Sequence, residues 1–98
     1  MNENIANWNV RGLNRRSRRS AINELVRSER VSLLCLQETK LDDVNNSLMM
    51  EMLGIDFDYF ALPAVNTCGG ILVASNKYVW DVSQPRRGNH SLSVKVAL

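Results

Sequence analysis

The chain has 98 residues, of which 45% are hydrophobic and 22% are charged, and its formal net charge is +2. These values are typical of one small globular domain and exclude a disordered chain. No apolar stretch is long enough to cross a bilayer, and the opening residues, "MNENIANW", lack the apolar segment of a secretory signal. We therefore expect an intracellular protein, nuclear or cytoplasmic, that is not secreted and has no membrane partner.

The first part of the chain predicts a βαβ unit. Residues 4–10 read as a short strand that ends before Gly12, and residues 15–30 as a helix. Residues 31–37, "VSLLCLQ", form a nearly continuous apolar run, typical of a strand buried on both faces. The connection between the two strands should be right-handed. The apolar stripe expected on the helix consists of Ala21, Ile22, Leu25 and Val26.

The remainder predicts one more helix and several strands. Residues 42–54 indicate a helix that ends at Gly54. Its inward positions are expected to be Val44, Leu48, Met49 and Met52. Alternation and apolar runs predict strands over 57–63, 69–75, 78–84 and 91–98, with a loop over 85–90. The sequence thus favours an α/β fold with a mixed sheet.

Basic residues gather immediately after the first predicted strand. Five of the twelve basic residues lie within nine positions that contain no acid. The helix dipole disfavours positive charge at a helix start, so helix stability alone does not explain the cluster. Two interpretations stay open: contacts to a phosphate-rich partner, or a solvated helix start. The cluster consists of Arg11, Arg15, Arg16, Arg18 and Arg19.

The chain has little from which to build a zinc site or a nucleotide loop. Cys35 and Cys68 have no Cys-x-x-Cys spacing, and His90 is the only histidine. A reducing compartment fits these free cysteines. Gly69 and Gly70 begin a predicted strand, where they are expected to allow close packing or a bulge. No helix follows them, so they do not indicate a phosphate loop. We expect no small-molecule cofactor.

Three motifs together resemble a known family. "WNVRGLN" (8–14), "LLCLQETK" (33–40) and "GGILVAS" (69–75) are similar to the opening of the endonuclease/exonuclease/phosphatase family. The wording of the first two is most similar to the endonuclease domain of plant LINE-type retrotransposons. The resemblance implies the N-terminal portion of a four-layered α/β sandwich, a mixed sheet with helices on its outer face. It also implies a truncated, partial domain over 1–98 that lacks the C-terminal half.

The resemblance further implies a site and a substrate. Glu38 would be the carboxylate that binds Mg²⁺ or Mn²⁺, and Asn9 the catalytic amide near the phosphate and the metal. DNA would be the partner. Parallel neighbouring strands would bring these two side chains to one edge of the sheet. The residues that would face nucleic acid are Arg11, Arg15, Arg16 and Lys40.

Departures from the family pattern limit this expectation. Arg11 stands where many repair-type members have aspartate, and the family's later catalytic motifs cannot be mapped onto this sequence; His90 lacks the context of the family's terminal histidine. We therefore expect a phosphodiester hydrolase fragment that is inactive or nearly so. Two alternatives remain: a non-enzymatic retrotransposon remnant, and a weak nucleic-acid-binding module that uses the arginine-rich helix. Self-association through the exposed sheet is also expected.

Overall fold

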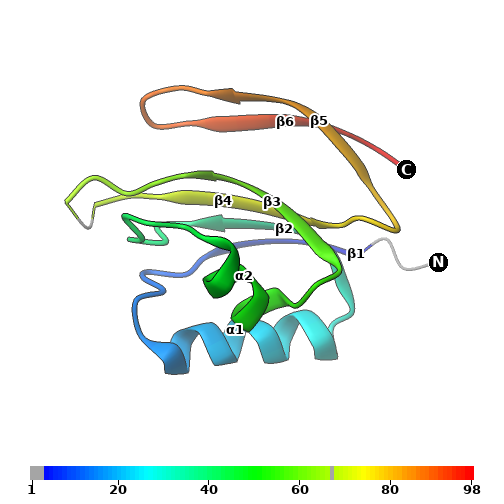
Figure 1. Ribbon diagram of the computed structural model, residues 1–98, viewed down its shortest axis with the longest axis horizontal. Coiled ribbons are helices and arrows are strands. Elements are labelled where there is room, and N and C mark those ends of the chain that lie inside the picture. Colours follow the sequence, from blue (N-terminus) through cyan, green and yellow to red (C-terminus); the bar gives the residue numbers. More distant parts are fainter. Residues whose placement is uncertain (1–3, 67) are drawn as a thin grey trace.

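The protein has three layers, with a mixed sheet in the middle (Figure 1). This computed structural model describes residues 4–66 and 68–98. Two helices cover one face of a four-stranded sheet, and a two-stranded hairpin lies over the other face. The α/β class and the mixed sheet with helices on its outer face are confirmed. Within the described residues, none of the helices combines the length and the apolar character needed to span a bilayer.

The βαβ unit is present as predicted. Strand β1 (Asn4–Asn9) runs parallel to β2 (Val31–Gln37), and helix α1 (Arg16–Ser28) connects them. The bounds of β2 match the prediction. Helix α1 buries Ile22 and Val26 against the sheet, because these residues lie one turn apart on one side of the helix. The rest of the predicted stripe lies outside the core: Leu25 is 41% exposed and Ala21 is exposed.

Two antiparallel strands complete the sheet. Strand β4 (Ile71–Asn76) pairs with β2 on one side and with β3 (Phe57–Leu62) on the other, so the strand order is β1-β2-β4-β3. Helix α2 (Asn46–Leu53) begins four residues later than predicted. Asn45 caps it by accepting a hydrogen bond from the Leu48 backbone N–H at 2.9 Å. Val44 therefore lies before the helix, but it still packs against the core, as predicted, and so does Leu48.

The core lies between the sheet and the two helices. Side chains alternate along each strand, so one set from each strand faces the helices. The register confirms this, because the two central strands place buried residues opposite each other: Leu34 with Ala74, and Leu36 with Leu72. All four are 0% exposed. Met49 and Met52 of α2 close the core from the helix side, which confirms their predicted inward position.

The hairpin consists of β5 (Asp81–Arg87) and β6 (Leu92–Ala97) and departs most from the sequence expectation. Residues 78–80 were expected in a strand but form a turn, because the backbone N–H groups of Val79 and Trp80 both donate to Asn76 O. The predicted loop over 85–90 is also wrong in its first half, since residues 85–87 belong to β5. A bulge at Gln84 and Pro85 shifts the register there. The bulge accommodates Pro85, which has no backbone N–H to donate to the neighbouring strand.

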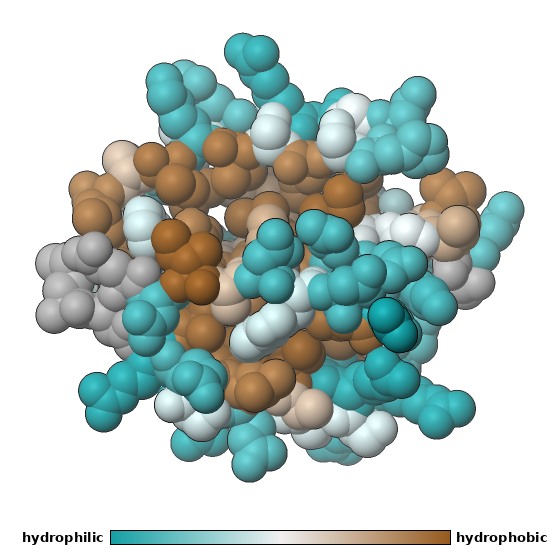
Figure 2. Space-filling view, turned by 180° about the vertical axis from the view of Figure 1, so that it is seen from behind, coloured by the Kyte–Doolittle hydropathy of each residue, from teal (hydrophilic) through white to brown (hydrophobic). Residues whose placement is uncertain are grey.

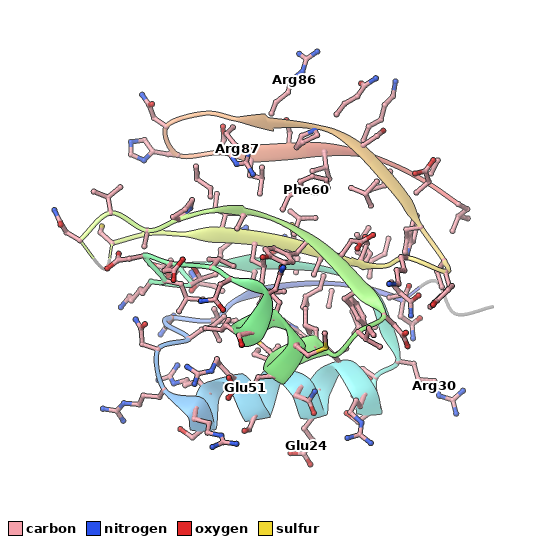
Figure 3. The ribbon with its side chains drawn as sticks, in the orientation of Figure 1. Glu24, Arg30, Glu51, Phe60, Arg86 and Arg87 are labelled. Carbon is pink, nitrogen blue, oxygen red and sulfur yellow. The ribbon has the colours of Figure 1, made fainter. Side chains whose placement is uncertain are left out.

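One arginine ties this hairpin to the central sheet. Arg87 Nε donates to Ala61 O in β3 at 2.9 Å, while Arg86 points away from the sheet (Figure 3). Phe60 points from β3 into the space below the hairpin. On the far side of the molecule from this view, hydrophobic residues reach the surface in a broad band (Figure 2). Ile5 is 63% exposed, at the start of edge strand β1.

Candidate functional site

The carboxyl ends of β1 and β2 place the two predicted site residues beside each other. Asn9 is the last residue of β1 and pairs with Gln37, the last residue of β2; Glu38 follows at once. Parallel neighbours are about 4.8 Å apart, so both backbones lie at the same rim of the sheet. Asn9 and Glu38 are both exposed. The connections β1–α1, β2–α2, β3–β4 and β5–β6 all lie at this end (Figure 1).

Backbone hydrogen bonds join three loops at this rim. Gly12 N–H donates to Glu38 O at 2.8 Å, and Leu13 N–H donates to Thr39 O at 2.8 Å. On the other side, Thr39 N–H donates to Gly70 O at 3.1 Å, and Lys40 N–H donates to Gly69 O at 2.8 Å. The segment 38–40 is therefore held between the other two loops. Its position does not depend on side-chain contacts alone.

The same loops contain residues in a costly backbone conformation. Glu38, Lys40 and Arg11 have φ values of 54°, 57° and 52°. Such left-handed conformations are rare for residues other than glycine and persist where the surroundings hold them in place. Three of the six non-glycine residues described with positive φ lie here. The left-handed turn at Glu38 ends the strand and turns its carboxylate out of the regular alternation of β2.

Asn9 and Glu38 face different immediate surroundings. Asn9 Oδ1 accepts a long hydrogen bond, 3.3 Å, from the Arg11 backbone N–H, so the amide also closes a local turn. Asn9 lines a groove of about 360 Å³ beside α1. Glu38 lines a larger groove of about 700 Å³ between the sheet and the turn of the hairpin. His90 lines this larger groove as well, although its sequence context indicated only a loop residue.

The basic residues divide into two groups. Arg18 and Arg19 donate to backbone carbonyl groups of the β1–α1 loop. Arg16 Nε lies 3.6 Å from Glu51 Oε1, although the Arg16 side chain is 83% exposed. Arg11 and Arg15 are exposed, and neither side chain forms a hydrogen bond or ion pair with another described residue. Only part of the arginine cluster is therefore available to a partner.

Lys40, another residue expected to face nucleic acid, belongs to the joined loops. Its carbonyl accepts from Asn14 Nδ2 at 2.7 Å. Its side chain passes close to Gly12, where an added Cβ would lie 3.5 Å from Lys40 Cδ. The lysine stem thus crosses from the β2–α2 loop to the β1–α1 loop. The structure brings Asn9, Glu38, Arg11 and Lys40 to one rim.

The donors at this rim suit a hard cation better than zinc. No group of three or more histidine, cysteine or acidic side chains that could hold a metal occurs in the described ranges, 4–66 and 68–98. Mg²⁺ prefers oxygen ligands, keeps several waters and needs only one or two protein carboxylates. One exposed carboxylate, Glu38, on the strand that pairs with the strand of Asn9, fits that pattern. A tetrahedral zinc site would need sulfur or imidazole ligands that the rim does not bring together.

Two further residues support the rim, although neither was among the predicted site residues. Thr39 is 1% exposed, and its Oγ1 accepts from the Leu41 backbone N–H at 3.4 Å. Gly70 has φ of 95°, and a Cβ there would collide with Thr39 Oγ1. The sequence offered only two signals for this contact. One was a threonine directly after an acidic residue, and the other was the second glycine of a pair.

Comparison with known proteins identifies the family. No curated protein matches the sequence. The profile of the Endonuclease/Exonuclease/phosphatase family matches residues 6–93, a range that contains both strand ends, all three joined loops and most of the hairpin. On this match the chain belongs to the endonuclease/exonuclease/phosphatase family.

Proposed function

We propose that this domain is of the metal-dependent phosphodiester hydrolase type and that DNA is its substrate. The observation that carries the proposal is the placement of Asn9 and Glu38 on the ends of paired parallel strands, within loops joined by backbone hydrogen bonds. The residues of the motifs "WNVRGLN" and "LQETK" favour a relationship to the endonucleases of plant LINE-type retrotransposons within this family. An intracellular location follows from that assignment.

In this proposal each rim residue has a defined task. Glu38 provides the carboxylate that holds Mg²⁺ or Mn²⁺, and the cation supplies positive charge where negative charge develops on the phosphoryl oxygens. Asn9 is uncharged and offers both an amide donor and an acceptor, so it can orient a phosphate oxygen beside the carboxylate. Arg11, Arg15 and Lys40 are exposed or half-buried cations close to that rim and would contact neighbouring phosphates, whereas Arg16 pairs with Glu51.

We further propose that residues 1–98 are part of a larger domain and hydrolyse DNA slowly or not at all alone. The family's later motifs, which supply a general base and further phosphate contacts, have no counterpart in this sequence. General acid–base catalysis contributes about 10²–10⁴-fold, and a single phosphate-stabilising donor about 10²–10³-fold. A retrotransposon remnant without catalytic function agrees with the same prediction.

A plasmid-nicking assay tests the proposal. Supercoiled plasmid is incubated with the 98-residue chain and Mg²⁺ or Mn²⁺, with Glu38→Gln as the site variant and Glu24→Gln, on the exposed side of α1, as the matched control. We expect nicking at or near background. Rapid nicking that Glu38→Gln abolishes would contradict the predicted inactivity and support the site. Rapid nicking that Glu38→Gln leaves unchanged would refute the assignment of Glu38.

The arginine-rich helix is a weaker candidate as an independent nucleic-acid-binding module. Arg18 and Arg19 donate to backbone carbonyls, and Arg16 and Arg19 both pair with Glu51. A module that used the whole helix would lose a large part of its salt dependence when those arginines were neutralised. We expect the loss to come from Arg11 and Arg15 instead, which a salt titration of DNA binding with each variant measures.

A further inference from the structure

Two arginines of α1 contact the loop that follows Asn9. Arg18 Nη1 donates to Val10 O at 3.0 Å. Arg19 Nη1 donates to Leu13 O at 2.8 Å and to Asn14 O at 2.9 Å. These three acceptors are the backbone carbonyls of the segment immediately after β1. That segment also donates to Glu38 O and Thr39 O, so it is bonded both to the two arginines and to the β2–α2 loop.

Arg19 is held in turn by helix α2. Its Nε lies 3.3 Å from Glu51 Oε2, and its Nη2 donates to Glu51 Oε1 at 3.5 Å. The Nε has no acceptor in hydrogen-bond geometry among the described residues, so the Nε contact is an ion pair and not a second hydrogen bond. The Arg19 side chain is only 15% exposed. Figure 3 shows Glu51 beside the first turns of α1, between the two helices.

This burial and pairing argue against a phosphate contact for Arg19. An arginine that binds phosphate presents its guanidinium to the partner. The Arg19 guanidinium instead donates to two backbone carbonyls and pairs with a carboxylate. Arg27, which lies on the same helix two turns further on, is exposed and makes no such contacts in the described part of the chain. The two arginines share a helix and a charge but differ in their surroundings.

We propose that Arg18 and Arg19 are positioning residues: acting through the carbonyls of Val10, Leu13 and Asn14, they hold Asn9 in register with Glu38 for a divalent cation. The proposal rests on the proposed function, since it concerns the same rim. In this role neither arginine would contact the cation or the substrate directly, because their guanidinium groups bond to the loop carbonyls. Glu51 fixes Arg19 and so links helix α2 to the site.

The direction in which cation affinity changes separates a positioning role of Arg19 from a simple effect of its charge. A positive side chain near a cation site repels the cation, so removal of that charge alone would strengthen cation binding. Loss of positioning has the opposite sign, because residues that orient metal ligands typically contribute about 10–100-fold in affinity. Arg19→Gln is therefore expected to weaken cation binding despite the removal of a positive charge.

The test measures Mn²⁺ binding by the 98-residue chain through the electron paramagnetic resonance signal of the free ion. Arg19→Gln and Arg18→Gln are compared with Arg27→Gln, the matched control on the same helix. We expect affinity about tenfold lower in Arg19→Gln and a smaller loss in Arg18→Gln, which has one bond, with Arg27→Gln within about twofold of the parent chain. Equal or tighter binding in Arg19→Gln would overturn the proposal. If Arg19→Gln does not fold, as shown by circular dichroism, Arg18→Gln decides by the same criterion.

A second readout keeps failure of the proposal separate from failure of the proposed function. If Glu38→Gln leaves Mn²⁺ binding unchanged, or if the parent chain binds none, the metal function is refuted. Amide hydrogen exchange at Gly12 and Leu13 then still tests the loop contact, because both N–H groups are bonded to the Glu38 loop. Faster exchange in Arg19→Gln than in Arg27→Gln supports the positioning of the loop, and equal exchange overturns it.

Discussion

Gly70→Ala is predicted to disrupt the loop that carries Glu38. Gly70 is buried and has φ of 95°. An alanine Cβ would collide with Thr39 Oγ1 and would lie 3.2 Å from the Lys40 backbone nitrogen. Thr39 cannot move away easily, because it is 1% exposed and its backbone N–H donates to Gly70 O. The substitution therefore forces the segment 39–40 away from the 69–70 loop.

The free energy of unfolding should fall by about 2–5 kcal/mol, the sum of two costs. A left-handed conformation costs a residue with a Cβ about 1–2 kcal/mol, and an added methyl in a closed site costs about 1–3 kcal/mol. Gly69→Ala separates them, because Gly69 has φ of 77° and nothing within 4 Å of an added Cβ. The control should lose only the first part, about 1–2 kcal/mol.

Urea unfolding followed by tryptophan fluorescence measures both variants. Thr39→Ala in the Gly70→Ala background removes the oxygen that the new methyl would meet, so the two substitutions should cost less together than the sum of their separate costs. If Gly70→Ala matched Gly69→Ala within about 0.5 kcal/mol, the close packing of the two loops would not exist as described.

Three further predictions concern the core, the hairpin connection and the thiols. Leu36→Ala should lower the free energy of unfolding by about 2–5 kcal/mol in urea titrations, because Leu36 is 0% exposed; a loss below about 1 kcal/mol would contradict the core assignment. Trp80→Phe should cost about 1–3 kcal/mol, since Trp80 Nε1 donates to the buried Ser32 Oγ at 3.0 Å; no change in melting temperature would contradict that bond. Burial raises the pKa of the Cys35 thiol, so at pH 8 less of it is thiolate and iodoacetamide should label it more slowly than exposed Cys68; peptide mass spectrometry that shows equal rates would contradict this burial.

The sequence predicted elements well where burial alone determines structure. The apolar run 31–37 became β2 with the same bounds, because a strand between two neighbours and two covering layers needs apolar residues throughout. The helix over 15–30 was correct in type and long by one or two residues at its ends, where caps rather than periodicity decide. The βαβ unit that these elements form places Asn9 and Glu38 at one end of the sheet.

Elements decided by local side-chain contacts were not predicted. Tyr78, Val79 and Trp80 have strand-forming side chains, yet Asn76 binds three successive backbone N–H groups there and forms a turn. Asn45 likewise displaced the start of α2. Such contacts depend on where one polar side chain meets the backbone, and periodicity contains no information about them.

The same reason limits prediction of the site. The rim position follows from the order of strands, which the motifs imply. The contacts of Arg18 and Arg19 depend on the path of the β1–α1 loop, with its left-handed residue at Arg11. From the sequence these arginines could not be distinguished from Arg15 and Arg16.

The most direct test of the shared rim is a Mn²⁺ titration of the ¹⁵N-labelled chain followed by nuclear magnetic resonance. Bound Mn²⁺ broadens the amide signals of residues close to it. We expect sub-stoichiometric Mn²⁺ to broaden the signals of Asn9 to Gly12 and of Glu38 to Lys40 first, and we expect Glu38→Gln to remove this effect. Broadening centred elsewhere, for example at Asp58 of β3 and Asp81 of β5, which line one groove, would contradict a cation site at the shared rim.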